Sequence, residues 1–476
     1  MPIPLGRWAP PVVVWLVAAV PPPLPAQDSL TARVDRLFEA WDRPASPGCA
    51  LAVIRAGRIV YQRGYGRANL EHDIPIAPST VFYVGSVSKQ FTAAAVALLA
   101  QDGRVSLDDD VRRYIPELPV YGRPITIRQL IHHTSGLRDY YALRVLAGLP
   151  ADGVFGDGDV LEILARQRAL NFEPGAEHLY SNSGYFLLSV IVRRVTGQTL
   201  RQVAEARIFL PLGMAHTHFH DDHAMVVPGR ASAYRPDSGG YRLSVPNFDV
   251  VGAGGLLTTV EDFLLWDRNF YEGTVGGRAL IDQLVTPGHL NDGTALRYAF
   301  GLTVDAYRGR RIVDHTGSYG GYVADVLRFP DLRFSVACFC NSSGIQPSRL
   351  ARQVADIYLA EQLGPAPRPD SSLATRTRSE MRMVRPDFAA QFAGTYHSDE
   401  LDATYRIVAD SARLSVQPGP APAVALDPGE GRDEFVTPRQ ATLRFTRDRA
   451  GRVSGFTLAA GRVRGIRFTR RSESPR

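Results

Sequence analysis

The chain has 476 residues, of which 45% are hydrophobic and 21% are charged. This composition is that of an ordinary globular protein with an ample core, and the length favours two domains over one. The net charge of +6 is spread along the chain, with acidic residues interleaved among the basic ones. A nucleic-acid-binding protein needs a clustered basic face, so we expect no nucleic-acid partner.

Residues 1–26 have the pattern of a secretory signal peptide. Arg7 precedes an apolar run over residues 12–20, and a proline-rich segment ends at Ala26, where cleavage is expected. The run is too short to span a membrane, no cysteine near the cleavage site indicates a lipid anchor, and no later segment is long and apolar enough to cross a bilayer. We expect a secreted or periplasmic protein without a stable membrane anchor; a retained anchor is the alternative.

Strand patterns lie at both ends of residues 27–364, with helical patterns between them. In chain order, the sequence predicts a helix at residues 30–41, strands at 48–55 and 58–66, an alanine-rich buried helix at 91–100, helices at 184–196 and from residue 259, strands at 311–315, 322–329 and 333–340, and a helix at 347–363. We expect an α/β (α+β) domain in which one antiparallel sheet, assembled from both ends, is flanked by helices and carries a helical subdomain.

Residues 365–386 are rich in proline, serine and arginine, which predicts a linker. Short alternating runs follow within residues 387–476, at 404–408, 423–426, 441–446, 454–458 and 463–468. Turn signals separate these runs, and their spacing favours a small β-barrel or sandwich as a C-terminal domain.

The three cysteines fall on predicted strands. Cys338 and Cys340 alternate on one strand and therefore point to the same face, and Cys49 begins another strand. We expect buried free thiols, with a bridge from Cys49 to one of the pair as the alternative in an oxidising compartment.

Lys89 is the only lysine among the 54 lysine and arginine residues of the chain. Arginine cannot lose its proton in a protein, whereas a buried lysine can do so and act as a base. Ser86 precedes Lys89 by three residues, at the start of the predicted buried helix, and residues three apart share a helix face. Ser-x-x-Lys is a known spacing of nucleophile and base, so we expect both residues to be catalytic.

Two further stretches supply what an acyl-transfer site also needs, a proton path to the leaving group and donors for the oxyanion. Tyr180 and Asn182 lie just before a predicted helix. In an extended segment they would point the same way, as a phenol that relays a proton and an amide that holds a substrate carbonyl. His315-Thr316-Gly317 ends a predicted strand and is followed by further small residues, which let a substrate lie along the strand edge.

Taken together and in this order, these stretches resemble the three motifs of the serine β-lactamase and penicillin-binding protein superfamily. The tyrosine in the second motif makes the chain similar to one branch of this superfamily. That branch includes class C β-lactamases, D-alanyl-D-alanine carboxypeptidases, D-aminopeptidases and related esterases. Further stretches that look like this branch are His133-Thr134-Ser135-Gly136-Leu137, Pro211-Leu212-Gly213-Met214 and Gly252-Ala253-Gly254-Gly255-Leu256. The resemblance covers residues 28–363, and the C-terminal runs are similar to the lipocalin-like barrels of some D-amino-acid-specific peptidases in this branch.

The resemblance implies a role for each matched residue. Ser86 would be acylated, Lys89 would accept its proton, and Tyr180 would carry protons to and from the leaving group. The backbone N–H groups of Ser86 and Ser318 would form the oxyanion hole. The substrate-binding residues would be Asn182, which would hold the substrate amide, with His315, Thr316 and Gly317. It implies no cofactor and no metal, and a small-molecule or peptide substrate: a D-amino-acid peptide, an ester or a β-lactam.

His315 stands where class C β-lactamases usually have lysine. Histidine is mostly neutral at pH 7, so it offers less positive field to a substrate carboxylate and to Lys89. Peptidase and esterase relatives do have histidine there. We therefore predict a secreted serine hydrolase of D-amino-acid peptides, esters or related amides. The alternatives are a β-lactamase proper and a penicillin-sensing or cell-wall-binding protein with little turnover; no oligomeric state is predicted.

A competing motif is His218-x-His220-x-Asp222-His223, which fits the metal-binding spacing of metallo-β-lactamase-fold hydrolases, with His216 nearby. That motif normally follows a buried strand, whereas here it follows a helix-like run and a turn, so we expect a solvated loop. No Gly-x-Ser-x-Gly stretch indicates an α/β-hydrolase triad. The adjacent histidines at positions 132 and 133 are expected to serve loop structure.

Overall fold

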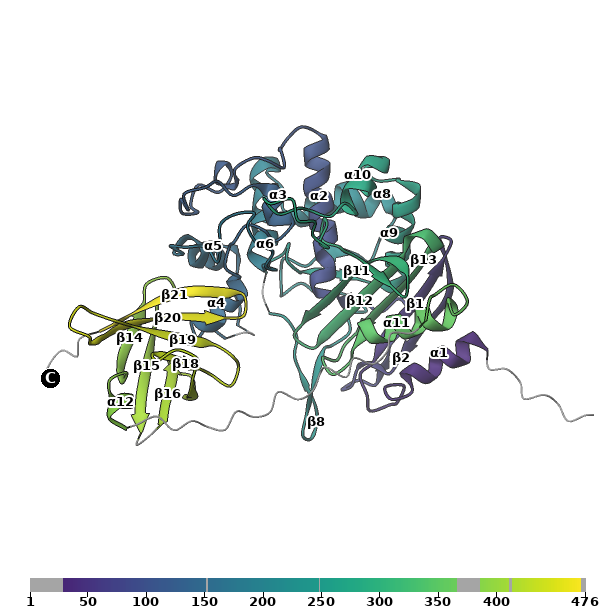
Figure 1. Cartoon of the computed structure of the whole chain (residues 1–476). Coiled ribbons are helices and arrows are strands. Elements are labelled where there is room, and N and C mark those ends of the chain that lie inside the picture. The colour runs from purple at the N-terminus through teal and green to yellow at the C-terminus, as the bar shows by residue number, and fades with distance from the viewer. Residues whose placement is uncertain (1–28, 151–152, 248, 366–385, 411–412, 472–476) are drawn as a thin grey trace, which may run out of the picture.

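The computed structural model describes residues 29–150, 153–247, 249–365, 386–410 and 413–471. The predicted signal peptide, residues 1–26, lies outside the described residues, and so does nearly all of the predicted linker, residues 365–386. Figure 1 shows an N-terminal part, in which helices surround a sheet, and a C-terminal barrel beside it. Within the described ranges, no helix combines the length and the hydropathy that a membrane crossing requires.

A six-stranded antiparallel sheet forms the centre of the N-terminal part. Its strands, in spatial order, are β10 (Thr303–Tyr307), β11 (Arg310–Tyr319), β12 (Tyr322–Phe329), β13 (Phe334–Cys340), β1 (Cys49–Arg55) and β2 (Arg58–Tyr65). β1 pairs with β13, so the first and last segments of this part lie side by side. The predicted sheet assembled from both ends is confirmed, and β10 is a strand that the sequence pattern did not indicate.

Both faces of this sheet are covered by helices, which explains why its central strands β12 and β13 are buried at every position and mostly apolar. Successive side chains point to opposite faces, so Leu51 of β1 belongs to one apolar cluster and Ala52 to the other. The first face packs on α1 (Leu30–Phe38) and α11 (Pro347–Tyr358), and the second on α9 (Val260–Glu272). Phe263 of α9 contacts both Phe339 of β13 and Phe91 of α2 (Lys89–Gln101).

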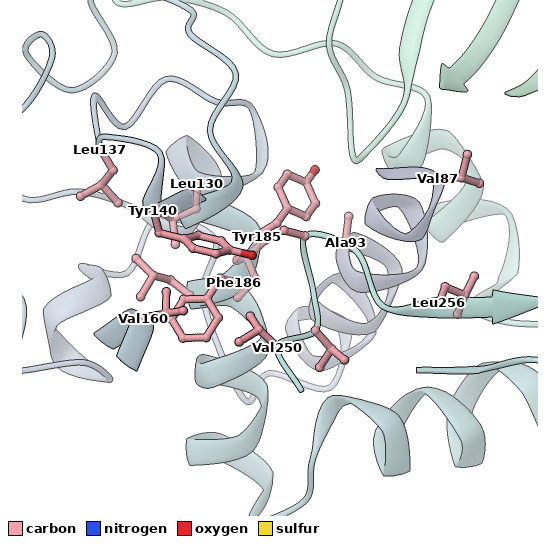
Figure 2. Packing of buried hydrophobic residues seen from close by; sticks show 14 of the residues in the cluster. Val87, Ala93, Leu130, Leu137, Tyr140, Val160, Tyr185, Phe186, Val250 and Leu256 are labelled. Carbon is pink, nitrogen blue, oxygen red and sulfur yellow. The ribbon is translucent and has the colours of Figure 1, made fainter. Parts of the chain in front are cut away.

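The helical subdomain packs around α2 and α6 (Asn182–Thr196). Figure 2 shows Tyr185 and Phe186 of α6 in one cluster with Ala93 of α2 and Leu130 of α3. The remaining helices are α3 (Ile127–Ile131), α4 (Tyr140–Leu146), α5 (Asp157–Ala165), α7 (Leu200–Ala204), α8 (Leu210–Leu212) and α10 (Gly277–Leu284). Small sheets pair β3 (Arg67–Asn69) with β4 (Ile74–Pro75), β9 (Leu256–Thr258) with β5 (Phe82–Tyr83) and β6 (His218–Phe219), and β7 (Tyr234–Asp237) with β8 (Gly240–Leu243).

The C-terminal part is a closed antiparallel barrel, as the alternating runs predicted. A short helix, α12 (Pro386–Ala390), precedes it. Its strands are β14 (Gly394–Ser398), β15 (Ala403–Asp410), β16 (Arg413–Pro418), β17 (Val424–Pro428), β18 (Glu434–Val436), β19 (Thr442–Arg447), β20 (Val453–Ala460) and β21 (Val463–Arg470). Aromatic rings such as Phe445 and Phe456 fill its interior. Closure leaves no unpaired sheet edge.

The barrel lies beside α4 (Figure 1). Polar contacts, including a buried ion pair, join it to the helical subdomain. Arg138, whose side chain is 1% exposed, forms an ion pair of 2.6 Å with Glu400 at the start of the β14–β15 turn region. The hydroxyl of Tyr405 on β15 donates to the carbonyl of Leu146 in α4, at 2.7 Å. Since breaking a buried pair leaves an uncompensated charge, this contact holds the two parts in one arrangement.

The cysteine expectation is corrected by the structure. Cys49 and Cys340 form a disulfide between β1 and β13, where the strand register places them opposite each other. Cys338 is the buried free thiol. The sequence pattern located all three on strands, but only the pairing of β1 with β13 decides which two meet.

Asp325 of β12 is a carboxylic acid buried on the sheet face that carries α11. It has no exposed surface, and neither side-chain oxygen has a hydrogen-bond partner among the described residues. Burial, and next the carboxylate of Asp314, raise the pKa of Asp325 well above its ordinary value, while Arg352 lowers it. Asp325 is therefore neutral in the folded protein at pH values where the unfolded chain ionises it.

We expect Asp325→Asn to flatten the pH dependence of stability. Because the folded pKa is raised, wild-type stability is highest below the unfolded pKa of about 3.9 and falls as the pH rises, by up to about 1.4 kcal/mol per pH unit, until the folded pKa is reached. Asparagine keeps the shape and cannot ionise, so this loss disappears. Urea unfolding of both proteins at several pH values between 4 and 8 measures the two slopes; parallel slopes would contradict a neutral Asp325.

Candidate active site

Ser86 and Lys89 lie where the chain enters α2. Ser86 belongs to a short 3₁₀ turn, η1 (Gly85–Ser88), and Lys89 is the first residue of α2. Their separation of three residues places both side chains on the same face, and Nζ of Lys89 lies 3.1 Å from Oγ of Ser86. Ser86 is partly exposed, whereas Lys89 is fully buried. The hydroxyl thus faces solvent and the amine lies behind it.

The surroundings of Lys89 favour a neutral amine. Its Nζ lies 3.0 Å from Oδ1 of Asn182 and 2.6 Å from the carbonyl oxygen of Ala253, in addition to Ser86. Burial lowers the pKa of Lys89 well below its ordinary value; Asp139 raises it and Arg462 lowers it. A neutral amine has two N–H donors and one lone pair. The two carbonyl-type oxygens can accept the donors, which leaves the lone pair for the hydroxyl proton of Ser86.

Tyr180 and Asn182 reach the same place from the start of α6. Nζ of Lys89 lies 4.8 Å from the centre of the Tyr180 ring, and the Ser86 side chain is close enough to the Tyr180 hydroxyl to lower its pKa. Burial raises the pKa of Tyr180, while the contact with Ser86 and the charge of Arg462 lower it. Ser181 has extended backbone, and Asn182 is already the first residue of the helix. The two side chains nevertheless meet at Ser86 and Lys89.

Two residues that the sequence did not predict as site residues, Asp139 and His133, hold this segment. Oδ2 of Asp139 accepts the backbone N–H of Asn182 at 2.8 Å, which satisfies a donor that the start of a helix leaves without a partner. Nδ1 of His133 accepts the backbone N–H of Ser181 at 3.2 Å, and its ring lies 4.2 Å from that of Tyr180. The resemblance included His133 in a motif, but neither local pattern indicated these contacts.

His315 lies in the cavity wall as a neutral side chain. Its Nδ1 donates to the carbonyl of Thr316 at 2.6 Å, so its Nε2 is an acceptor, and the hydroxyl of Tyr298 donates to it at 3.0 Å. Burial and then the charge of Lys89 lower the pKa of His315 to about 4. Tyr298 is a further residue that the sequence did not indicate.

The strand β11 passes directly beside the nucleophile turn because two glycines lie at the contact. A Cβ atom at Gly317 would lie 1.9 Å from the carbonyl oxygen of Val84 and 3.0 Å from N of Ser86, and one at Gly85 would lie 2.5 Å from N of Ser318. Any larger residue at either position would separate the two segments. The backbone nitrogens of Ser86 and Ser318 are thereby brought to one place, as two donors for an oxyanion require.

A single cavity of about 1000 Å³ gathers these groups. The predicted site residues that line this cavity are Ser86, Tyr180, Asn182, His315, Thr316 and Ser318. Lys89 and Gly317 are buried and do not line it. Arg462 of the barrel also lines it. No sequence signal singled out Arg462, which is one of many arginines.

The competing metal motif lies elsewhere. Ligand atoms of Asp222, His223 and Asp249 lie within 4.8 Å of one another near the surface, and neither Asp222 nor His223 is buried. Nη1 of Arg230 lies 3.3 Å from Nε2 of His220. This positive charge disfavours a metal ion bound by His220. None of these residues lines the cavity around Ser86.

Residues 34–360 match the Beta-lactamase family model, and the chain belongs to this family. It is a hydrolase related to the serine β-lactamases.

Within the family it is similar to a D-aminopeptidase of Gluconobacter oxydans, at 32% identity over 349 residues, which span 72% of this chain and 64% of that protein. A D-aminopeptidase of Brucella anthropi is 26% identical over 501 residues, which span 89% of this chain and 95% of the other. In fold, the chain is similar to an octameric penicillin-binding protein homologue from Pyrococcus abyssi, with a TM-score of 0.58, 24% identity, and coverage of 89% and 95% of the two chains.

Proposed function

We propose that this chain hydrolyses D-amino-acid peptides, amides or esters through an acyl-enzyme on Ser86, with Lys89 as the base. The observation that carries the proposal is the 3.1 Å contact between Nζ of Lys89 and Oγ of Ser86, in a pocket that lowers the pKa of Lys89. A neutral amine at this distance can take the hydroxyl proton as the oxygen attacks a carbonyl carbon.

In acylation, a bond forms between Oγ of Ser86 and the substrate carbonyl carbon while the serine proton passes to Nζ of Lys89. The carbonyl oxygen becomes an oxyanion, which the backbone N–H groups of Ser86 and Ser318 would stabilise. The bond to the leaving amine or alcohol then breaks. That group would receive its proton through the hydroxyl of Tyr180, which lies near the Ser86 side chain.

In deacylation, water attacks the ester carbon, its proton passes to the same Tyr180 and Lys89 pair, and Oγ of Ser86 leaves and regains a proton. The side-chain amide of Asn182, whose Oδ1 is held by Lys89, would bind the amide of the acyl part through its N–H groups. Every proton transfer in this scheme would run among Ser86, Lys89 and Tyr180, and the short contact between Ser86 and Lys89 supports it.

Two observations support D-amino-acid amides and esters rather than β-lactams as substrates. The similar proteins from Gluconobacter oxydans and Brucella anthropi are D-aminopeptidases. His315 is engaged by Tyr298 and Thr316, and its pKa of about 4 leaves it neutral at pH 7. It therefore adds no positive charge for the carboxylate of a β-lactam.

The test compares the p-nitroanilides and methyl esters of D-alanine and L-alanine, with and without an N-acetyl group, and a chromogenic cephalosporin. We expect the D forms to be hydrolysed at least about tenfold faster than the L forms, the low end of what a shaped pocket discriminates. Equal rates for D and L forms would contradict the D specificity. Faster turnover of the cephalosporin than of every D substrate would favour a β-lactamase.

We also propose that the protein is exported, with residues 1–26 as a signal peptide, residues 27–364 as the catalytic domain, residues 365–386 as a linker and residues 387–476 as the barrel domain. The disulfide between Cys49 and Cys340 supports an oxidising compartment, because such bonds are rare in the cytosol.

A further inference from the structure

Arg462 brings a positive charge from the barrel into the catalytic cavity. It lies in the turn between β20 and β21 and lines the same cavity as Ser86. Its guanidinium carbon lies 4.6 Å from the centre of the Tyr180 ring, and Nη1 lies 3.6 Å from Oδ2 of Asp139. The barrel therefore forms part of the wall of the active site.

The guanidinium of Arg462 has donors available for a ligand. The 3.6 Å contact with Asp139 is too long for a hydrogen bond, and 46% of the Arg462 side chain is exposed. Asp139 is buried, and its carboxylate already accepts the backbone N–H groups of Tyr141, Ala142 and Asn182. Across the described ranges, the Arg462 guanidinium makes no hydrogen bond to the protein and has no second carboxylate within 4 Å.

The other two arginines of the cavity wall differ in this respect. Arg297 forms an ion pair of 2.9 Å with Asp305, and Arg352 forms one of 2.7 Å with Asp314. Both guanidinium groups are thus within hydrogen-bond distance of a carboxylate of their own. Among the described residues of the cavity wall, Arg462 is the cationic side chain without such a partner.

The turn that carries Arg462 is held firmly. The backbone carbonyl oxygen of Arg462 accepts a hydrogen bond of 3.0 Å from Nδ2 of Asn171. Oδ1 of Asn171 accepts a hydrogen bond of 2.8 Å from the backbone N–H of Arg464. Arg138, which is paired with Glu400, also donates to the carbonyl of Arg464 at 3.0 Å. The backbone that carries the Arg462 side chain is thus fixed, so binding a ligand need not order the turn.

We propose that Arg462 binds a carboxylate on the acyl part of the substrate, so that the enzyme prefers D-substrates with an anionic group there over those with a neutral group. This inference rests on the proposed function. A guanidinium matches a carboxylate with two parallel N–H···O bonds. We assign the carboxylate to the acyl part because Arg462 lies beside Asp139, which fixes the backbone of Asn182, whose amide would bind the acyl part.

The test uses three p-nitroanilides of D-alanine that differ only at the α-nitrogen: the free amine, the N-acetyl form and the N-succinyl form. Wild-type kcat/KM is expected to be higher for the succinyl form than for the acetyl form. In Arg462→Ala the preference for succinyl over acetyl should fall by about 10- to 100-fold, mainly through KM. Arg462→Lys should restore part of it, since the charge remains without the planar fork.

Arg452→Ala is the matched control, because Arg452 lies in the turn between β19 and β20 with its side chain 80% exposed and lines no part of the cavity. It should keep the wild-type order. An unchanged succinyl-to-acetyl ratio in Arg462→Ala would overturn the proposal. An equal loss for all three substrates would overturn it too, because it would indicate altered proton transfer at Lys89 and Tyr180. Hydrolysis of none of the three by the wild type would contradict the proposed function, and this inference with it.

Discussion

Replacing Ser86 with alanine is expected to abolish covalent labelling and nearly all hydrolysis. The change removes the Oγ that lies 3.1 Å from Nζ of Lys89 and leaves the backbone N–H of position 86 in place. Loss of a serine nucleophile reduces the rate by several orders of magnitude even when binding and oxyanion contacts remain, so we expect kcat/KM to fall at least about a thousandfold. Intact-mass measurement after exposure to a fluorophosphonate or a fluorescent penicillin, beside the hydrolysis rate, tests both effects.

Ser318→Ala is the matched control for labelling. Ser318 lines the same cavity and its side chain is exposed, and alanine keeps the backbone N–H that would hold the oxyanion. The wild-type mass increase should therefore persist in Ser318→Ala. An adduct that persists in Ser86→Ala would show that another group is the nucleophile, whatever the remaining rate.

The parts of the site that could be predicted are those encoded by short sequence separations. Ser86 and Lys89 share a helix face because they are three residues apart, and the rarity of lysine in this chain marked position 89. Tyr180 and Asn182 were predicted as a pair on an extended segment; the structure instead starts α6 at Asn182, yet both still reach Ser86. The apolar patterns likewise predicted the sheet and the barrel, because burial on one or both faces leaves a direct record in the sequence.

The contacts that the sequence did not indicate join segments far apart in the chain. Asp139 holds Asn182 and Tyr298 holds His315, and Cys49 meets Cys340 only because β1 lies beside β13. Arg462 is the clearest case. Lys89 is conspicuous as the only lysine, whereas Arg462 is one of 53 arginines, so nothing in the sequence distinguishes it. Only the docking of the barrel places Arg462 at the active site.

The chemical role of Lys89 can be separated from its charge by Lys89→Arg. Arginine keeps a positive charge but cannot release its proton, so it cannot accept the proton of Ser86. We expect kcat/KM to fall at least about a hundredfold, the scale on which general-base catalysis contributes. Near-normal activity of Lys89→Arg would overturn the assignment of Lys89 as the base. Because Lys89 is fully buried and arginine is larger, the thermal midpoint of the variant must be compared with that of the wild type.

Lys89→Met provides the matched comparison, since methionine has a similar length, removes both the charge and the base, and suits a buried site. If Lys89 acts as the base, both variants lose activity, whereas a purely electrostatic role predicts that Arg retains activity and Met does not. The pH dependence of the wild type gives an independent check. Burial lowers the pKa of Lys89, so the active neutral amine is present above that lowered pKa, and kcat/KM should fall as the pH drops through it. This acidic limb should be absent from the residual activity of both variants; its persistence would assign the limb to another group.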